Sequence, residues 1–284
     1  METSPFLSVQ DHTVSGEKFI LVNCVSCGFL FTADPPAADK IGNYYQSDAY
    51  ISHTDSHEGM FNKLYQLVRK ITLFSKRKIV EQYSGIRKGK VLDYGCGTGA
   101  FLKEMKISGW ETLGVEPDPG ARQRAIDLTG SQIEDPSALT KMSDNNFDAI
   151  TLWHVLEHVH DLGLVLSKFH QILNDKGILL IAVPNHKSFD AKHYGAHWAA
   201  YDVPRHLYHF SPDTISQLLF KYGFKRVGIK PMWFDAFYVS MLSEQYRNGK
   251  MKIIPAFLTG LISNLQALFK PGTCSSQIYI FRKK

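Results

Sequence analysis

The sequence of 284 residues has few cysteines, no long apolar run and no large excess of charge of one sign. Its four cysteines include a single CxxC pair, which is too little for a disulfide framework in a chain of this length. We therefore expect a reducing, cytoplasmic location. No stretch reaches about 18 uncharged apolar residues, and the N-terminus lacks a charged segment followed by an apolar run. We expect neither a transmembrane helix nor a signal peptide, and no stable insertion into a membrane.

The formal net charge of +5 is small, and the basic residues are scattered. Their densest group, Arg69–Lys70 with Lys76–Lys78, falls on a predicted amphipathic helix. We interpret it as a solvated helix face rather than a nucleic-acid contact. The sequence after the fourth strand, Trp-His-Val-Leu, also differs from the Asn-Pro-Pro-aromatic tetrad of enzymes that act on flipped bases. We therefore predict no nucleic-acid partner.

Apolar strands alternate regularly with helices over residues 89–232. The predicted strands are KVLDY, ETLGVE, FDAITLW, GILLIAVP and FKRVGIKPM, and SQIYIFRKK forms a last strand at the chain end. Such alternation is typical of a parallel sheet with helices on both faces. The predicted fold class is α/β, with a doubly wound, mostly parallel seven-stranded Rossmann-like sheet whose last strand is antiparallel.

The segment VLDYGCGTGAFL, residues 91–102, joins an apolar strand to a helix through Gly95, Gly97 and Gly99. Three glycines in such a turn let the backbone approach a nucleotide without a Cβ in the way. The spacing also satisfies the pattern of dinucleotide-binding loops, so it does not exclude NAD. Asp93, just before the glycines, would face a pyrophosphate badly and suits an amino-bearing ligand. Glu116 ends the next strand, where a carboxylate can bind both ribose hydroxyls.

Four motifs in order, VLDYGCGTGAFL, GVEPD, FDAITLWHVLEHVHD and ILNDKGILLIAVPN, resemble those of the class I S-adenosylmethionine-dependent methyltransferases. The resemblance covers about residues 89–232 and the last strand. It implies that S-adenosyl-L-methionine is the cofactor. The residues that it implies for binding are the glycine-loop backbone (Gly95, Cys96, Gly97, Gly99), Asp93 at the amino-acid part, Glu116 and Pro117 at the ribose, Trp153 and His154 at the methionine end, and Tyr45 in a cover.

Candidate catalytic residues lie in two segments. Glu157 and His158 follow the fourth strand, at the carboxyl edge of the sheet where such folds place their sites. They are candidates for a general base, although His158 could simply hold its loop by a hydrogen bond. Arg205 and His206 lie in the long aromatic segment 193–212, which resembles a stretch of one small-molecule branch of the superfamily. This segment is predicted to wall a substrate pocket, unless Asp202 and Arg205 form a structural pair and the aromatic residues are core.

The segment CVSCG resembles half of the zinc-binding module found in some sugar and small-molecule methyltransferases. A structural zinc needs four ligands, and no second CxxC accompanies Cys24 and Cys27. We therefore expect a hairpin without zinc. Two histidine pairs have helical spacing but no carboxylate pattern around them, namely His193/His197 and His154/His158. We expect no metal in the active site.

These patterns divide the chain into three regions. Residues 1–50 form a degenerate zinc-ribbon-like hairpin and a cover with Tyr44, Tyr45 and Tyr50; residues 51–88 form a helical linker or lid; residues 89–284 form the methyltransferase domain. A helical insertion at 233–273 includes the apolar segment IIPAFLTGLISNLQALF. This segment lacks Lys and Arg, which favours internal packing or a homodimer surface over a membrane-surface helix.

The sequence as a whole predicts an S-adenosylmethionine-dependent methyltransferase that moves a methyl group to a small-molecule acceptor by in-line displacement. O-methylation is favoured because base candidates are present, while N- and C-methylation stay open. The alternatives are an NAD-dependent oxidoreductase and a non-catalytic protein that binds S-adenosylmethionine or a partner. The acceptor, the adenine-contacting residue and the oligomeric state are not determined by the sequence.

Overall fold

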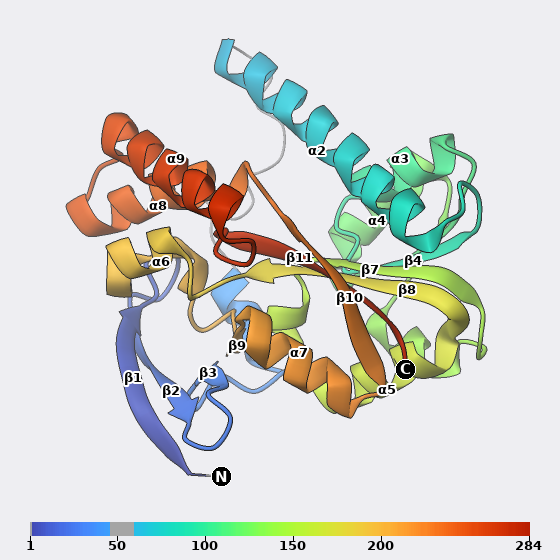
Figure 1. Ribbon diagram of the computed structural model, residues 1–284, viewed down its shortest axis with the longest axis horizontal. Coiled ribbons are helices and arrows are strands. Elements are labelled where there is room, and N and C mark those ends of the chain that lie inside the picture. Colours follow the sequence, from blue (N-terminus) through green and yellow to red (C-terminus); the bar gives the residue numbers. More distant parts are fainter. Residues whose placement is uncertain (1, 46–59) are drawn as a thin grey trace.

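The computed structural model describes residues 2–45 and 60–284. These residues form two sheets, one with seven strands and one with four. The larger sheet lies at the centre between helices, and the strands of the N-terminal segment lie to one side of it, at the lower left of Figure 1. Tyr50 lies outside the described residues.

The large sheet has the strand order β10-β11-β8-β7-β4-β5-β6. Neighbouring strands are parallel from β8 to β6, whereas β11 is antiparallel to both β8 and β10. The predicted α/β class, with a mostly parallel seven-stranded sheet and an antiparallel last strand, is confirmed. The strands are β4 (Lys90–Tyr94), β5 (Glu111–Val115), β6 (Gln132–Glu134), β7 (Phe147–Trp153), β8 (Leu173–Pro184), β10 (Phe224–Pro231) and β11 (Ser276–Lys283).

Helices cover both faces of this sheet, with α2, α3 and α4 above it and α5 and α7 below it in Figure 1. Successive side chains of a strand point to opposite faces, so each strand serves two cores. In β4, Val91 packs in the core with α2 and α3, whereas Leu92 packs in the core with α5 and α7. The helices are α2 (Met60–Ser84), α3 (Ala100–Ile107), α4 (Pro119–Thr129), α5 (Leu162–Ile172) and α7 (Pro212–Lys221).

Helix starts follow local capping chemistry. The Ser211 hydroxyl accepts a hydrogen bond from the Thr214 N–H at 3.3 Å at the start of α7, as Ser-Pro predicts. The Asp118 carboxylate accepts from the Ala121 N–H at 2.6 Å and caps α4 directly after β5. The turn from β5 into α4 is therefore short, and it lies at the carboxyl edge of the sheet, where ligands of such folds bind.

The small sheet is antiparallel and has the order β1-β2-β3-β9. Its strands are β1 (Thr3–Gln10), β2 (Lys18–Cys24), β3 (Leu30–Thr32) and β9 (Tyr208–His209). The predicted hairpin of β2 and β3 is present. Strand β1 is not indicated by the sequence, because most of its side chains are exposed and it carries no clear apolar alternation.

The segment that follows β8 is more structured than the predicted loop. It forms α6 (Phe189–Tyr194) and two short 3-10 helices (Gly195–His197 and Ala199–Tyr201) before β9. Trp198 and Tyr201, expected to wall a substrate pocket, are buried with Leu21 and Leu30 of the small sheet. These aromatic residues are therefore core, as the alternative interpretation has it, and they join the N-terminal sheet to the rest. The division into three regions stays a prediction.

The insertion before β11 forms α8 (Asp235–Asn248) and α9 (Ile253–Phe269), which lie beside α6 in Figure 1. Helix α9 turns small residues inward, and a Cβ at Gly260 would lie 2.8 Å from Cδ1 of Phe237. Its apolar residues face outward, Phe257 and Leu268 being 55% and 60% exposed. The prediction that these side chains pack inside the protein is therefore wrong. The prediction that they form a homodimer surface is not tested and stays a prediction. Within the described residues, no helix is long and apolar enough to cross a membrane.

Candidate active site

The glycine loop lies between β4 and α3, at the carboxyl edge of the large sheet. Gly95, Gly97 and Gly99 have φ values of 77°, 54° and 82°, which only glycine adopts without strain. The Gly95 N–H donates to the carbonyl of Val115 at 2.7 Å, which folds the loop against β5. A Cβ at Gly97 would meet no atom within 4 Å, so the space beside this residue is open to a ligand. The Cys96 thiol packs inside the protein, so Cys96 can serve a ligand through its backbone.

Gly95→Ala is expected to lower the free energy of unfolding by more than the about 1–2 kcal/mol of a left-handed residue alone. The added Cβ would clash with Cγ2 of Val155, in addition to the strain of positive φ. Gly97→Ala is the matched control, because it has positive φ but open space. Urea denaturation measures both, and equal losses would contradict the steric explanation.

Glu116 directly follows β5 and is 8% exposed. Its Oε2 accepts a hydrogen bond from the Gly97 N–H at 2.8 Å, and its Oε1 accepts from the Asp118 N–H at 3.0 Å. Burial raises the pKa of this carboxyl in spite of both hydrogen bonds. Each oxygen keeps a second lone pair, so the carboxylate is held rigidly beside the loop and can still accept from two hydroxyls. Pro117 follows it on the surface.

Asp93, at the end of β4, is 1% exposed and accepts a hydrogen bond from the Thr151 hydroxyl at 2.7 Å. Burial raises the pKa of Asp93 to about 7, although Thr151 and the Lys76 cation oppose the rise. Lys76 reaches in from α2, and its Nζ lies 4.4 Å from the centroid of the Trp153 ring. Burial lowers the pKa of Lys76, against the attraction of Asp235 and Asp93. Within the described residues, Lys76 forms no ion pair with either carboxylate.

His154 directly follows β7, and its side chain contacts Asp235 on α8. Its Nε2 lies 2.9 Å from Oδ2 of Asp235, and its Nδ1 lies 3.4 Å from Oε1 of Glu157. Burial lowers the pKa of His154, but the two carboxylates outweigh burial and raise it to about 9. The imidazole is therefore charged at neutral pH and offers no lone pair. The neighbouring Trp153 ring meets Phe101 edge to face at a centroid distance of 5.1 Å.

Three of the four predicted catalytic residues converge. One ring nitrogen each of His158 and His206 and one oxygen of Glu157 lie within 4.8 Å of one another. The Glu157 side chain is 1% exposed, and the rings of His158 and His206 meet edge to face at 4.6 Å. The Tyr45 hydroxyl lies 3.0 Å from Nδ1 of His158, so Tyr45 contacts this group from the N-terminal segment.

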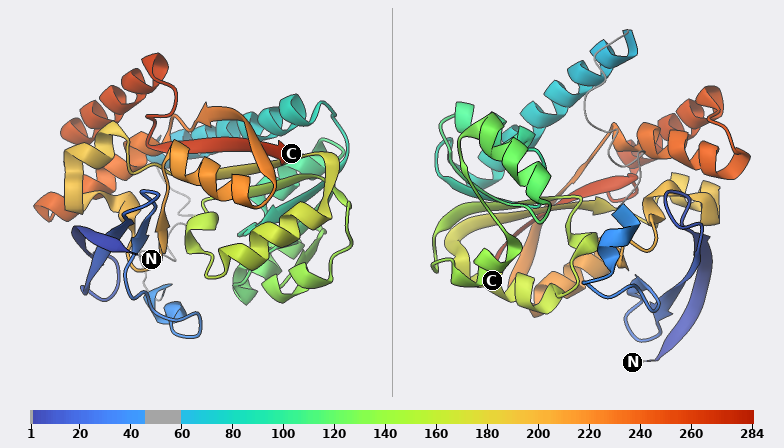
Figure 2. Two further views of the ribbon diagram at one scale, coloured as in Figure 1. Left: turned by 60° about the horizontal axis from the view of Figure 1, so that its bottom comes forward. Right: turned by 180° about the vertical axis from the view of Figure 1, so that it is seen from behind.

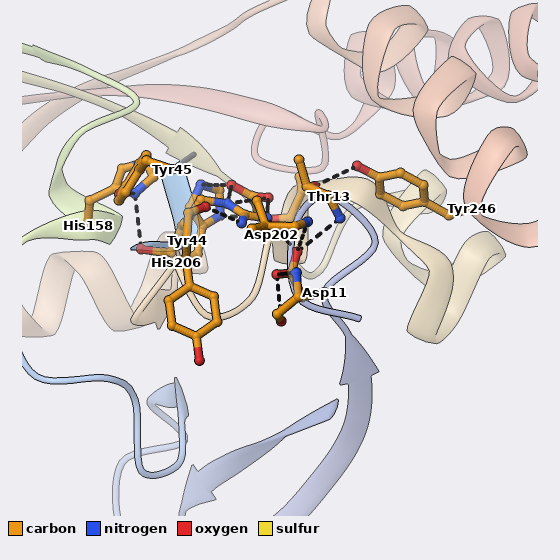
Figure 3. Close-up of polar contacts among 12 residues, drawn as sticks. Asp11, Thr13, Tyr44, Tyr45, His158, Asp202, His206 and Tyr246 are labelled. Atoms are coloured by element: carbon orange, nitrogen blue, oxygen red, sulfur yellow. Dashed lines mark hydrogen bonds and ion pairs between the residues drawn. The ribbon is translucent and has the colours of Figure 1, made fainter. Parts of the chain in front are cut away.

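The fourth predicted catalytic residue, Arg205, is 1% exposed and holds other parts of the chain. Its partners Asp11, Tyr44 and Asp202 are labelled in Figure 3. Its guanidinium donates to the Asp202 carboxylate, the shortest distance being 2.6 Å, and to Oδ1 of Asp11 at 3.0 Å. It also donates to the carbonyl of Tyr44 at 2.7 Å. We name Asp11, Tyr44, Asp202 and Arg205 the N-terminal latch. Asp202 and Arg205 are thus a structural pair, and we expect Arg205 to position Tyr45 rather than touch a ligand.

The CxxC pair lies at the end of β2, remote in the chain from the other site residues. Cys24 is buried with its Sγ 3.1 Å from the Ser26 hydroxyl, and Cys27 is exposed. In the part of the chain that the structure describes, no third potential ligand joins them in a metal-binding cluster. The zinc-ribbon-like character of this hairpin stays a prediction.

The chain matches a known protein family over most of the large sheet and its helices. A family model described as a methyltransferase domain matches residues 58–228, more than half of the chain. The chain belongs to the class I S-adenosylmethionine-dependent methyltransferases.

A curated relative is named a methyltransferase. The ubiquinone biosynthesis O-methyltransferase of Azorhizobium caulinodans is 27% identical over 158 residues, which are 51% of this chain and 62% of that protein. This methyltransferase therefore spans less than two thirds of the length of that relative.

Solved structures share the fold. A methyltransferase from Thermotoga maritima, described as a possible histamine N-methyltransferase, has a TM-score of 0.53 at 19% identity and covers 78% of this chain and 95% of its own. Phosphoethanolamine N-methyltransferase 2 from Haemonchus contortus, in complex with S-adenosyl-L-methionine, has a TM-score of 0.55 at 15% identity, with coverages of 89% and 61%. At these identities the likeness concerns the fold alone.

The methyltransferase site suits S-adenosylmethionine by features of its own structure. The open space at Gly97 admits a ligand, the Glu116 carboxylate can accept from ribose hydroxyls, and the Asp93 carboxylate suits an ammonium group. Lys76 supplies a cation for a carboxylate close to Asp93. The individual cofactor-binding roles, including those of Trp153, His154 and Tyr45, stay predictions.

Lys76→Met is expected to weaken binding of S-adenosylmethionine about tenfold, because it removes a cation close to Asp93 that we expect to face the amino-acid part of the cofactor. The free energy of unfolding should not fall, because burial disfavours the charged lysine and methionine carries no charge. Lys78→Met is the matched control, because Lys78 is 52% exposed on the solvent side of the same helix. Calorimetric titration measures both, and equal affinities would contradict the role of Lys76.

Sequence reasoning missed Lys76 by assigning the whole basic group to a solvated face. That interpretation is wrong for Lys76, which follows Leu73 by three residues and precedes Val80 by four; both pack against the large sheet. This helical spacing places Lys76 on the buried side and could have identified it. Asp235, which holds His154, gives no such signal, because only the fold brings α8 to β7.

Proposed function

We propose that this methyltransferase transfers the methyl group of S-adenosyl-L-methionine to a hydroxyl oxygen of a small-molecule acceptor. The convergence of Glu157, His158 and His206 next to the carboxyl end of β7 carries the proposal. A hydroxyl is a weak nucleophile until it loses its proton, and a carboxylate beside two imidazoles is suited to receive that proton. Trp153 ends the same strand, so the acceptor and cofactor sides of the site adjoin.

The protonation states of the cluster support this role. Burial, with the neighbouring His206, lowers the pKa of His158 to about 4, so the imidazole is neutral at pH 7. Burial favours the neutral form of Glu157, but the three histidines around it outweigh burial and lower its pKa. Both groups are therefore unprotonated at neutral pH, as a proton acceptor has to be.

On the cofactor side, we infer that Asp93 holds the ammonium group, Lys76 the carboxylate and Glu116 the ribose. When bound there, S-adenosylmethionine supplies an electrophilic methyl group on a sulfonium sulfur. The protein then has to exclude water and to orient the acceptor oxygen in line with that methyl group. Tyr45, placed over His158 by the N-terminal latch, is suited to cover this side.

The name of the Azorhizobium caulinodans relative supports O-methylation in particular, because that protein is named a ubiquinone biosynthesis O-methyltransferase. The exposed apolar face of α9 supports an acceptor or a second copy with an apolar surface. The homodimer, the small-molecule acceptor and the lack of a nucleic-acid partner belong to this proposal.

The test is methyl transfer from methyl-deuterated S-adenosylmethionine to a panel of phenols, catechols, aliphatic alcohols and amines, followed by mass spectrometry. We expect the labelled methyl group on oxygen. Glu157→Gln should lower kcat about 10²- to 10⁴-fold with unchanged cofactor affinity. His160→Gln is the control, because His160 is exposed two residues beyond the cluster.

The two alternatives predict different results in the same experiment. A non-catalytic protein would bind S-adenosylmethionine, transfer nothing and be indifferent to Glu157→Gln. An NAD-dependent oxidoreductase would bind NADH in a parallel titration, an outcome that the membership in the methyltransferase family disfavours. Transfer to nitrogen alone would overturn the O-methylation proposal.

A further inference from the structure

The cluster of Glu157, His158 and His206 places three electron-pair donors together in a buried space. Neither oxygen of Glu157 accepts a hydrogen bond within residues 2–45 and 60–284. His154 is 3.4 Å from Oε1 and supplies one positive charge, but Oε2 has no partner in that part of the chain. Nε2 of His206 is 4.0 Å from Oε1, too far for a hydrogen bond. A buried carboxylate without hydrogen-bond donors is unfavourable, and a bound ligand would supply the missing interaction.

The hydrogen bonds of the two imidazoles fix which nitrogen carries a proton. Nδ1 of His158 lies 3.0 Å from the carbonyl oxygen of Arg205, and Nδ1 of His206 lies 2.9 Å from that of Ala200. A carbonyl oxygen only accepts hydrogen bonds, so an Nδ1 that is bonded to one donates. The Tyr45 hydroxyl, 3.0 Å from Nδ1 of His158, can then accept from the same N–H. In a neutral imidazole Nε2 then holds a free lone pair. Metal-binding histidines show this arrangement, one nitrogen donating to an oxygen and the other facing the ion.

We propose that Glu157, His158 and His206 bind a divalent transition-metal cation, of which Zn²⁺ is the representative. Two imidazoles and one carboxylate are a donor set that Zn²⁺ accepts, whereas Mg²⁺ prefers oxygen alone. Three protein ligands leave one position open, as in catalytic rather than structural zinc sites. The histidine pairs with helical spacing in the sequence are four residues apart, whereas His206 comes from a segment distant from Glu157 and His158.

The identity of the fourth ligand rests on the proposed function: it is the acceptor hydroxyl. A hydroxyl bound to a divalent cation loses its proton at a lower pH, and the proton passes to solvent. With the cation bound, Glu157 and His158 therefore act as ligands and no longer receive the proton themselves. The oxygen electron pair then forms the bond to the methyl carbon as the bond from that carbon to sulfur breaks. The sulfonium becomes a neutral thioether, and each turnover releases one proton. No oxidant or reductant is required.

The test is a titration of the metal-free full chain with Co²⁺, followed by Zn²⁺ and, separately, Mg²⁺. We expect one Co²⁺ per chain with visible absorption of a four- or five-coordinate site, displaced by Zn²⁺ and not by Mg²⁺. Glu157→Gln and His206→Asn should each weaken Co²⁺ binding at least tenfold, the loss seen when only a supporting residue is removed. His206→Asn keeps an N–H that can donate to Ala200 while it removes Nε2.

His193→Asn is the control, because His193 is exposed on α6 and lies outside the cluster. Its Co²⁺ affinity should equal that of the wild type. Thermal denaturation checks folding, and the isosteric Glu157→Gln carries the test if His206→Asn does not fold.

The readout is metal binding, so its failure differs from failure of the proposed function. A folded chain that binds S-adenosylmethionine but takes up no Co²⁺ overturns the metal site and leaves O-methylation standing. Unchanged affinity in both variants overturns this set of ligands. Metal bound with the expected affinities, but no methyl transfer to oxygen, supports the site and overturns the proposed function.

Discussion

Arg205→Met is expected to lower the free energy of unfolding by about 3–5 kcal/mol, because it leaves buried carboxylates without their cation. The side chains of Arg205 and Asp11 are 1% and 0% exposed, and Asp202 is 22% exposed. The N–H groups of Thr13 and Ser15 still donate to Asp11, but they bring no full positive charge. Urea denaturation measures the loss. Limited proteolysis should also show faster cleavage of the N-terminal segment once the latch is broken.

Arg122→Met is the matched control for this experiment. Arg122 pairs with Asp135 at 3.1 Å, and the two side chains are 21% and 53% exposed. Such a pair contributes about 0–1 kcal/mol. Asp11→Asn combined with Arg205→Met should recover part of the loss, because it removes one of the stranded charges. A loss for Arg205→Met no larger than that for Arg122→Met would show that the latch does not hold the N-terminal segment.

Asp93→Asn is expected to weaken cofactor binding about 10- to 100-fold at pH 8, because it removes the carboxylate that we infer to face the ammonium group. In the wild type, affinity should also depend on pH, since burial raises the pKa of Asp93 to about 7. Binding of the cation requires the ionised form, so affinity should fall by up to about tenfold per unit below pH 7 and level off above it. Calorimetric titration with S-adenosylhomocysteine measures this, because no sulfonium acidifies its ammonium group. An equally steep profile in Asp93→Asn would contradict the assignment.

The same pKa has a consequence for the stability of the free protein. A carboxyl whose pKa rises from 3.8 to about 7 on folding binds a proton more tightly in the folded chain. Its contribution to the free energy of unfolding is therefore fully present below pH 3.8 and is lost as the pH rises to about 7. The slope within this window is at most about 1.4 kcal/mol per unit. Asp93→Asn should remove this part of the slope, and an unchanged pH dependence of unfolding would contradict it.

Much of the cofactor side could be predicted from the sequence, because its determinants are contiguous. The sequence shows three closely spaced glycines between a predicted strand and a predicted helix, and Glu116 at the end of the next strand. The structure gives these glycines positive φ values and places Glu116 directly after β5. The sheet follows from the same strand and helix alternation. The buried position of Lys76 could have been predicted from its helical spacing, but the neighbouring basic residues make the segment resemble a solvated helix face.

The acceptor side could be predicted only as a set of candidates. Glu157 and His158 are adjacent in the sequence, but nothing local indicates that His206 completes their cluster. The salt bridge between Asp11 and Arg205 spans 194 positions, and β9 joins the N-terminal sheet from far along the chain. The direction of the apolar face of α9 likewise depends on what packs beneath it.

The sequence by itself determined the α/β sheet, the glycine loop and the class of cofactor, because these rest on short-range periodicity and on backbone conformations that only glycine adopts freely. The tertiary structure alone decided that Arg205 is a latch residue and that Glu157, His158 and His206 meet. Burial, charge compensation and tautomeric state depend on neighbours that folding brings together, and no local pattern of residues carries them.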